Sequence, residues 1–204
     1  MIWNKRLQRL ALMLACVMLA HCTALPPAPE QAVNWERHQA RIIANQHWGF
    51  DSKLGIRSPE HSGSARLNWQ QRDQDYRLQL SGPLGQGAVV INGEPGLVTL
   101  EQSGEAPISA NSGEALLYEA SGWHLPLEQL TAWVRGIPAP GLAITALELD
   151  EHQLLAKLIQ GDWQLTYSRY GLYHDLYLPG RIVAENADTR LTLIIHQWQA
   201  QDSD

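Results

Sequence analysis

The side chains able to carry out chemistry are scattered along this chain of 204 residues. Histidine can ligate a metal or act as a general acid and base, but the seven histidines after residue 22 never stand at a helical pairing distance. They are His38, His47, His61, His124, His152, His174 and His196. Asp73 and Asp75 could form a carboxylate pair, yet their place between two alternating segments is typical of a solvated turn. No nucleophile elbow, His-Glu-x-x-His motif or phosphate-binding glycine loop occurs, so the sequence predicts no catalytic site, no metal and no cofactor.

The N-terminal segment has the pattern of a secretion signal. Residues 1–9 are basic and carry no acidic residue, residues 10–20 form an apolar run, and Cys22 follows. Such a run is too short to span a bilayer and is typical of a signal peptide. A cysteine at the cleavage point resembles the lipobox of bacterial lipoproteins, in which that cysteine becomes the acylated first residue. Cys22 is the candidate lipid anchor; acylation at Cys16, or secretion without acylation, remain the alternatives.

The composition limits the class of protein. The chain is 45% hydrophobic and 18% charged, enough for a single packed domain. Loss of residues 1–21 removes Lys5, Arg6 and Arg9, so 15 basic residues fall to 12 against 21 acidic ones and the formal charge goes from −6 to −9. An acidic surface disfavours nucleic acid and steady electrostatic adhesion to anionic lipid. We therefore expect membrane attachment through the lipid or through apolar insertion.

Four segments are expected along the chain. They are a signal peptide over 1–21, a lipidated proline-rich tether over 22–33, one domain over 34–198 and a polar tail over 199–204. The prolines of the tether favour an extended form of about 3.1 Å per residue. The domain opens with a helix predicted over 35–47, for which Asn34 is a suitable N-cap.

Alternating hydrophobic residues predict strands on both sides of a helical middle. The strands cover 53–56, 65–71, 76–80, 88–92 and 97–101, and then 143–149, 153–160, 163–169, 181–185 and 190–199. Helices are predicted over 114–120 and 126–135, the second stopped by Gly136. Short turns imply antiparallel pairing, and a sheet of this size curls. The fold class is therefore mainly β with α: a curled antiparallel sheet of about ten to eleven strands forms an incomplete barrel, and a helical lid encloses an apolar cavity.

Large apolar side chains are the most unusual feature of the domain. Seven tryptophans follow residue 22, and most must belong to the core, although several could line an open cavity with an apolar ligand. Strand alternation leaves two possible faces, and a bulge would exchange them locally. From the aromatic-rich face and the helix stripe, we expect the cavity to be lined by Trp69, Leu78, Leu80, Trp123, Leu127, Leu130, Trp133 and Trp163.

The segment 81–87 joins two predicted strands through a turn rich in glycine and proline. Leu84 lies at its tip between Pro83 and Gly85, where neighbouring residues cannot easily cover it. In a lipid-anchored protein, an apolar side chain on a protruding loop is a candidate membrane probe. The alternative is a leucine that folds back onto the sheet.

Together these residues resemble LolB, the family of outer-membrane lipoprotein receptors of Gram-negative bacteria. The most informative stretch is residues 67–100, which read LNWQQRDQDYRLQLSGPLGQGAVVINGEPGLVTL. Trp35 at the start of the domain, Trp133 before Gly136 and the closing Trp198 match as well. The order and spacing of these pieces behind a lipobox make the resemblance specific, and it covers nearly the whole chain.

The resemblance implies an antiparallel half-barrel and a task without catalysis. The protein would accept acylated lipoproteins from the periplasmic carrier LolA and insert them into the inner leaflet of the outer membrane, acting as a monomer that faces the periplasm. Leu84, in the place of the family's loop leucine, would serve the insertion step. Three acyl chains exposed to water would cost on the order of 30 kcal/mol, so we expect transfer between apolar sites, driven by differences in affinity.

Two other classes of function remain open from the sequence. A lipid-anchored module that binds fatty acids or glycolipids in another envelope pathway would share the cavity but would not need Leu84. An envelope hydrolase would need a nucleophile and a base in one cleft, which the sequence does not display.

Overall fold

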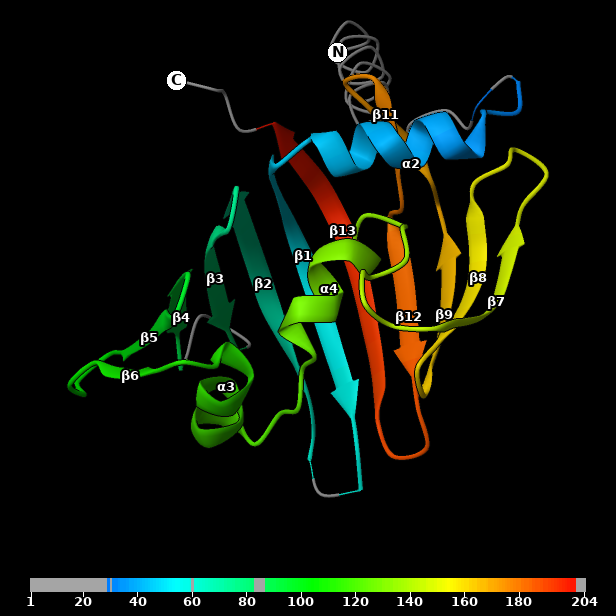
Figure 1. The fold of residues 1–204 in the computed structure, drawn as a ribbon. Coiled ribbons are helices and arrows are strands. Elements are labelled where there is room, and N and C mark those ends of the chain that lie inside the picture. Colours follow the sequence, from blue (N-terminus) through cyan, green and yellow to red (C-terminus); the bar gives the residue numbers. More distant parts are fainter. Residues whose placement is uncertain (1–28, 30, 60, 83–86, 201–204) are drawn as a thin grey trace, which may run out of the picture.

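One long antiparallel sheet dominates the computed structural model, which describes residues 29, 31–59, 61–82 and 87–200 (Figure 1). The sheet has 11 strands, and every recorded pairing is antiparallel. In spatial order they are β6 (Ile108–Ala110), β5 (Leu97–Gln102), β4 (Val89–Glu94), β3 (Asp75–Ser81), β2 (Ser62–Arg72), β1 (His47–Arg57), β13 (Arg190–Ala200), β12 (Arg181–Glu185), β9 (Trp163–Ser168), β8 (Leu155–Gln160) and β7 (Ile144–Leu149). The end strands β6 and β7 do not pair with each other, so the sheet curls without closing, as the sequence predicts.

Alternation of buried and exposed residues explains the curl. In β1 the side chains of Trp48, Phe50, Leu54 and Ile56 are buried on the concave face, whereas Lys53 between them is exposed. Burying one face of many adjacent strands drives a large twisted sheet to wrap around its apolar side.

A bulge in β13 settles which of its side chains point inward. Asp51 pairs with Gln197 and Ser52 with Ile195, so His196 is an extra residue in β13. A single inserted residue exchanges the two faces of a strand. Leu193 and Trp198 are therefore both buried on the concave side despite their different parity, and one strand serves the core along its whole length.

Helix α2 (Trp35–Ala44) lies across one end of the sheet (Figure 1). The Asn34 side chain accepts a hydrogen bond from the Arg37 amide at 2.9 Å, which is the N-cap the sequence predicts. The helix ends three residues before the predicted limit of 47, because His47 already pairs with Arg72 as the first residue of β1. The long β1 thus takes up the end of the predicted helix.

A small second sheet, which the sequence analysis does not predict, anchors α2. Strands β10 (Gly171–Tyr173) and β11 (Leu176–Leu178) form a hairpin of three residues each, too short to give a readable period. His38 of α2 is buried, and its Nε2 lies 3.0 Å from the Tyr177 carbonyl oxygen. This contact fixes the helix over the end of the sheet.

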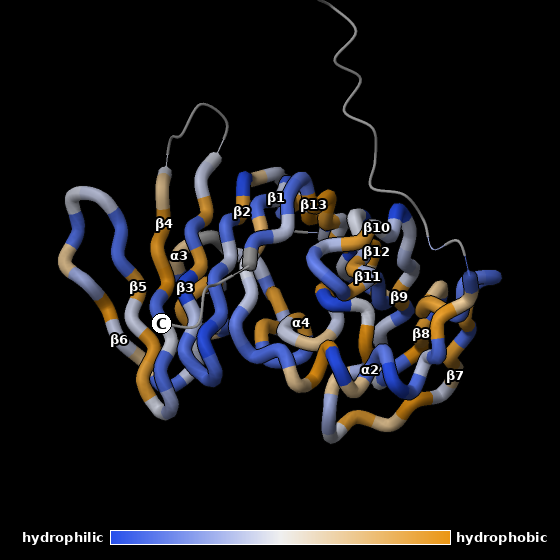
Figure 2. The backbone as a smooth tube through the Cα atoms, turned by 90° about the horizontal axis from the view of Figure 1, so that it is seen from above, coloured by the Kyte–Doolittle hydropathy of each residue, from blue (hydrophilic) through white to orange (hydrophobic). Residues whose placement is uncertain are grey.

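Two short helices, α3 (Gly113–Ser121) and α4 (Leu127–Trp133), form the insertion predicted between the two groups of strands. Seen from above, the strands form an arc and α4 lies inside it (Figure 2). The Tyr76 ring packs so tightly on Gly93 and Gly113 that a Cβ added to either glycine would lie within 2.4 Å of a ring or hydroxyl atom. These glycines let the N-terminus of α3 dock against β3 and β4.

The core is continuous over the concave face, with an aromatic cluster near α2. Trp48, Phe50, Trp69 and Trp198 form this cluster, with ring centroids 5.1–6.3 Å apart. Farther from α2 the core consists of aliphatic side chains between the sheet and α4. The final strand continues through Ala200, so the first two residues of the expected tail pair with β1. Among the described helices, none is long and apolar enough to cross a membrane.

Candidate acyl-binding site

A small cavity lies where α4 and the segments around it meet the concave face of the sheet. Its volume is about 30 Å³, close to the share of one water molecule in the liquid. Every lining residue is apolar: Leu54, Leu67, Trp69, Leu78, Leu80, Leu125, Leu127, Leu130, Val134, Ile182, Ala184, Leu191 and Leu193. The described conformation is therefore closed, with the apolar surfaces of the insertion and the sheet in contact.

Five of the eight residues expected at the cavity line it. Trp69, Leu78 and Leu80 come from the sheet, and Leu127 and Leu130 come from α4. The structure brings these five together from two separate parts of the chain. That they contact acyl chains stays a prediction.

The other three expected residues lie elsewhere. Trp133 is fully buried beneath α4 and packs against the half-buried Trp163, with ring centroids 5.9 Å apart. The Trp123 ring lies against Gly63 near the start of β2. None of the three lines the cavity. The aromatic-rich face and the helix stripe selected them, but large rings also serve as core wedges between a helix and a sheet.

Several aliphatic residues of the far half of the sheet line the cavity but were not among those predicted from the sequence. Leu191 and Leu193 of β13, and Ile182 and Ala184 of β12, line the cavity opposite β2 and β3. The period-two spacing of Leu191 and Leu193 was a usable signal, but the face of β13 could not be assigned without the bulge at His196.

Gln160 of β8 clamps the C-terminal side of the insertion. Its fully buried amide accepts from Trp133 Nε1 at 2.8 Å and from the Ala139 amide at 2.9 Å. Its Nε2 donates to the carbonyl oxygens of Ala139 at 2.7 Å and Leu142 at 3.1 Å. Four hydrogen bonds in an apolar surrounding hold this part of the insertion to the sheet.

Arg135 connects the insertion to the end of α2. Its Nη1 donates to the carbonyl oxygens of Ile42 at 2.8 Å and Asn45 at 3.0 Å, and its Nε donates to Thr131 at 2.9 Å. The guanidinium lies 5.2 Å from the Trp48 ring centroid, a cation–π contact. Burial lowers the pKa of Arg135 to about 10, so the group stays charged at neutral pH.

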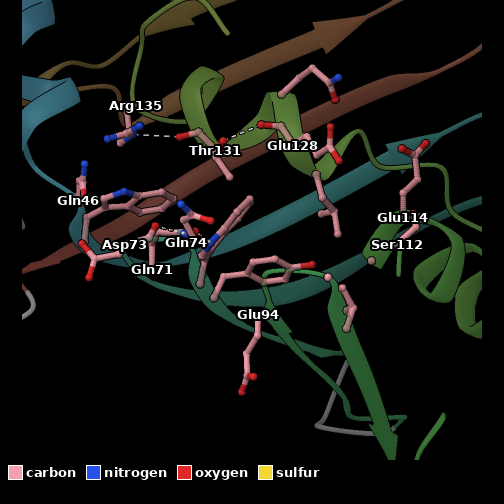
Figure 3. Close-up of a pocket in the computed structure, with 18 of the residues that line it drawn as sticks. Gln46, Gln71, Asp73, Gln74, Glu94, Ser112, Glu114, Glu128, Thr131 and Arg135 are labelled. Carbon is pink, nitrogen blue, oxygen red and sulfur yellow. Dashed lines mark hydrogen bonds between the residues drawn. The ribbon is translucent and has the colours of Figure 1, made fainter. Parts of the chain in front are cut away.

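A larger polar hollow lies beside the apolar cavity (Figure 3). It has a volume of about 730 Å³ and is bounded by the end of α2, the turns of β2–β3 and β4–β5, the start of α3, and α4. Four carboxylates line it: Asp73, Glu94, Glu114 and Glu128. Arg135 is the cation on this lining. The hollow thus presents an acidic rim.

Trp69 and Leu127 line both the polar hollow and the apolar cavity. The Trp69 indole Nε1 donates to Gln71 Oε1 at 3.1 Å, and Gln71 Nε2 donates to the Asp73 carbonyl oxygen at 2.9 Å. The indole is therefore held with its polar edge toward the hollow. These two residues form the partition between the rim and the cavity.

The rim is partly shielded from water. Burial raises the pKa of Glu114, with Glu128 adding to the rise and His124 opposing it. Burial also raises the pKa of Tyr76, again with a contribution from Glu128. Shielding strengthens the attraction between these carboxylates and any positively charged group that approaches the hollow.

The two remaining expected sites lie outside the described residues. The anchor candidate Cys22 precedes residue 29, and the loop residues Pro83, Leu84 and Gly85 fall in the gap between 82 and 87. Within the described part of the chain, no three His, Cys, Asp or Glu side chains come together as a metal site.

A half-barrel sheet closed by a helical insertion, with a small cavity lined only by apolar residues between them, defines the fold class of this chain. A solved structure has a similar fold: a LolA-superfamily protein of Nitrosomonas europaea superposes with a TM-score of 0.54 at 12% identity, covering 85% of this chain and 96% of that one. At this identity the likeness shows the fold alone.

The sequence comparisons show the family. The model of the family described as "Outer membrane lipoprotein LolB" matches residues 46–198. The outer-membrane lipoprotein LolB of Cellvibrio japonicus is 46% identical over 95% of this chain and 97% of its own length. That of Pseudomonas aeruginosa is 42% identical over 93% of this chain and 92% of its own. The chain belongs to the LolB family.

Membership in this family fixes the location and the kind of activity. The chain is a lipid-anchored protein of the outer membrane, with a role in lipoprotein transport. The family consists of lipoprotein-binding receptors and not of enzymes, which agrees with the lack of catalytic motifs in the sequence.

Proposed function

We propose that this protein takes acylated lipoproteins from the carrier LolA at its acidic rim, holds their acyl chains between α4 and the sheet, and releases them into the inner leaflet of the outer membrane. The wholly apolar lining beneath α4 carries the proposal. Hydrophobic burial is not directional, so one such site can accept many lipoproteins that share only their acyl groups.

Acyl chains would enter by displacing the insertion. A cavity of about 30 Å³ holds no chain, but thirteen apolar residues already face one another across it. Gln160 and Arg135 tie down the C-terminal end of the insertion, whereas the Pro126 end of α4 has no side-chain cap. We expect α4 to swing about its C-terminal end, so that each lost contact with the sheet is replaced by contact with cargo.

The carrier would dock at the polar hollow. The partition of Trp69 and Leu127 separates this hollow from the apolar cavity, so cargo handed over here has a short path to its site. The carboxylates of the rim would attract a basic face of the carrier, which raises the rate of encounter. Lys substitution of Glu94 and Glu128 should therefore slow transfer from the carrier more at low salt than at high salt.

Delivery would use the loop at the other end of β3. Leu84 is the residue of the loop expected to enter the bilayer, and an acidic side chain there would be costly to insert. Acyl binding does not involve this loop in the proposal. Acceptance and delivery should therefore be separable by substitution.

The test is a transfer assay with lipoprotein-loaded LolA and liposomes. The mature chain with Cys22→Ala, which removes the anchor, is compared with the same chain carrying Leu84→Glu. The parent should strip the carrier and deliver cargo to liposomes, whereas the Leu84→Glu protein should strip the carrier and retain its cargo.

Each other outcome contradicts one part of the proposal. If the parent takes no cargo from LolA, the receptor assignment fails, and a module binding fatty acids or glycolipids becomes the better explanation. If the Leu84→Glu protein delivers at the parent's rate, the assignment of Leu84 to insertion is wrong.

A further inference from the structure

An open hollow on the convex face of the sheet is lined by basic side chains that the proposed function does not use. It has a volume of about 810 Å³ and lies over β1 to β4. Lys53, Arg66 and His196 line it together with the polar residues Ser64, Asn68, Gln79 and Ser81. Gly82, which borders the gap at 83–86, and Ala88, two residues beyond the gap, also line it.

Two positive charges stand directly opposite each other in this hollow. Lys53 of β1 and Arg66 of β2 are register partners, and both side chains are exposed. Like charges in directly opposed positions destabilise a sheet. Among the described residues no ion pair is recorded for either side chain. The fold thus holds an unfavourable pair that an external anion would relieve.

The surrounding charges leave the hollow basic. Asp51 is the one carboxylate among its lining residues, and its oxygens already accept from the amides of Asn68, at 2.8 Å, and Gln199. Arg181 continues the row of Lys53 across β13, since both pair with Ile194. In a chain with a formal charge of −6, this grouping stands out against an acidic background.

The hollow lies at the end of the sheet where delivery is proposed to occur. Arg66 pairs with Ser81, the last residue of β3, which precedes the loop by one described residue. Strand neighbours are about 5 Å apart. A membrane reached by the loop would therefore bring its phosphate groups close to Arg66 and Lys53.

We propose that the basic convex hollow around Lys53 and Arg66 binds the phosphate groups of anionic phospholipid and orients the protein on the membrane for delivery. The inference rests on the proposed function in placing the β3–β4 end against the bilayer. It adds an electrostatic contact to the lipid anchor and the apolar loop, although the net charge of the chain alone disfavours one.

Vesicle binding measures this contact directly. The mature chain with Cys22→Ala is mixed with phosphatidylethanolamine vesicles with and without phosphatidylglycerol, and the bound fraction is measured by flotation. Lys53→Gln/Arg66→Gln should weaken binding to phosphatidylglycerol vesicles about 25-fold and leave binding to pure phosphatidylethanolamine unchanged. Arg37→Gln/Arg77→Gln, which removes the same charge near the α2 end, is the matched control and should bind like the parent.

The remaining outcomes overturn the proposal. If the parent binds both kinds of vesicle equally, or if both double variants lose the same amount of vesicle binding, the hollow does not bind anionic lipid. If the parent binds glycerol phosphate in solution as tightly as it binds the phosphatidylglycerol vesicles, the hollow is a site for free anions instead. Uptake of cargo from LolA is measured in parallel, without vesicles. If the parent takes up no cargo in that assay, the proposed function is wrong. The comparison of the two kinds of vesicle still decides the role of the hollow.

Discussion

Trp133 donates its indole N–H to Gln160 Oε1 over 2.8 Å, and both side chains are fully buried. This bond joins the last residue of α4 to β8, a strand on the far half of the sheet. The same amide group also holds the backbone of Ala139 and Leu142. Gln160 therefore holds the C-terminal part of the insertion to β8.

Replacing Gln160 by leucine should lower the free energy of unfolding by roughly 3 kcal/mol, because the indole N–H and the Ala139 backbone groups would be buried without partners. Chemical denaturation of the parent and variant measures the change. Gln164→Leu, an exposed change of the same kind on the neighbouring β9, is the control and should cost little. Equal losses in both variants would show that the four hydrogen bonds contribute no more than a surface amide.

Tyr167 and Tyr170 provide an opposed pair of substitutions. The Tyr167 hydroxyl is buried without a hydrogen-bond partner, whereas the Tyr170 hydroxyl donates to the Leu155 carbonyl oxygen at 2.8 Å. Tyr167→Phe should raise the free energy of unfolding by about 1 kcal/mol, and Tyr170→Phe should lower it by a similar amount. Thermal unfolding at neutral pH measures both changes; changes of the same sign would refute the distinction.

The same tyrosines predict a loss of stability in alkali. Burial raises the pKa of Tyr167 and of Tyr170 above the usual value of 10.0, so the unfolded chain loses these protons first. The stabilising contribution is complete below pH 10 and falls as the pH rises beyond it. Tyr167→Phe should make the decline above pH 10 shallower, and an unchanged slope would count against its burial in the folded state.

His38 predicts a loss of stability in mild acid. Burial lowers its pKa from the usual 6.5, and Arg41 adds to that effect, while the Tyr177 carbonyl oxygen opposes it. The unfolded chain therefore takes up this proton at a higher pH than the folded chain does. The contribution is present above pH 6.5 and is lost as the pH falls through the lower folded pKa. Denaturation curves between pH 7 and pH 5 should show a decline that is shallower in His38→Gln, whose amide can still donate to Tyr177.

The sequence predicts the sheet and the helical insertion because both follow from regular spacing. The N-cap at Asn34 and the stripe of Leu127 and Leu130 needed no knowledge of the partner surface. The bulge at His196 could not be read, since only the pairing with Asp51 and Ser52 reveals an extra residue. For the same reason Leu191 and Leu193 were not assigned to the cavity. Trp133 belongs to the helix stripe but does not line the cavity, because the spacing of a stripe does not say whether a ring faces a void or fills one.

Neighbouring residues of α4 allow a test of the acyl site itself. Leu130 lines the apolar cavity, whereas Gln129 lines the polar hollow on the same helix. Leu130→Glu would place a carboxylate among aliphatic side chains, where burying a charge is costly. With cargo bound, the carboxylate would be buried against the acyl chains, at the same cost. Gln129→Glu adds the same charge to a rim that is already acidic, at a side chain that is half-exposed.

We therefore expect Leu130→Glu to reduce the uptake of lipoprotein from LolA at least tenfold, and Gln129→Glu to change it by less than about threefold, on the scale of 1.4 kcal/mol for each factor of ten. Uptake is measured as cargo that migrates with the variant in the absence of liposomes. Because the charge could also unfold the domain, near-ultraviolet circular dichroism must show the tryptophan signals intact. Leu130→Met keeps the volume and the apolar character of the side chain, so this variant should take up cargo like the parent. A folded Leu130→Glu protein that accepts cargo at the parent's rate would mean that the acyl chains bind elsewhere than beneath α4.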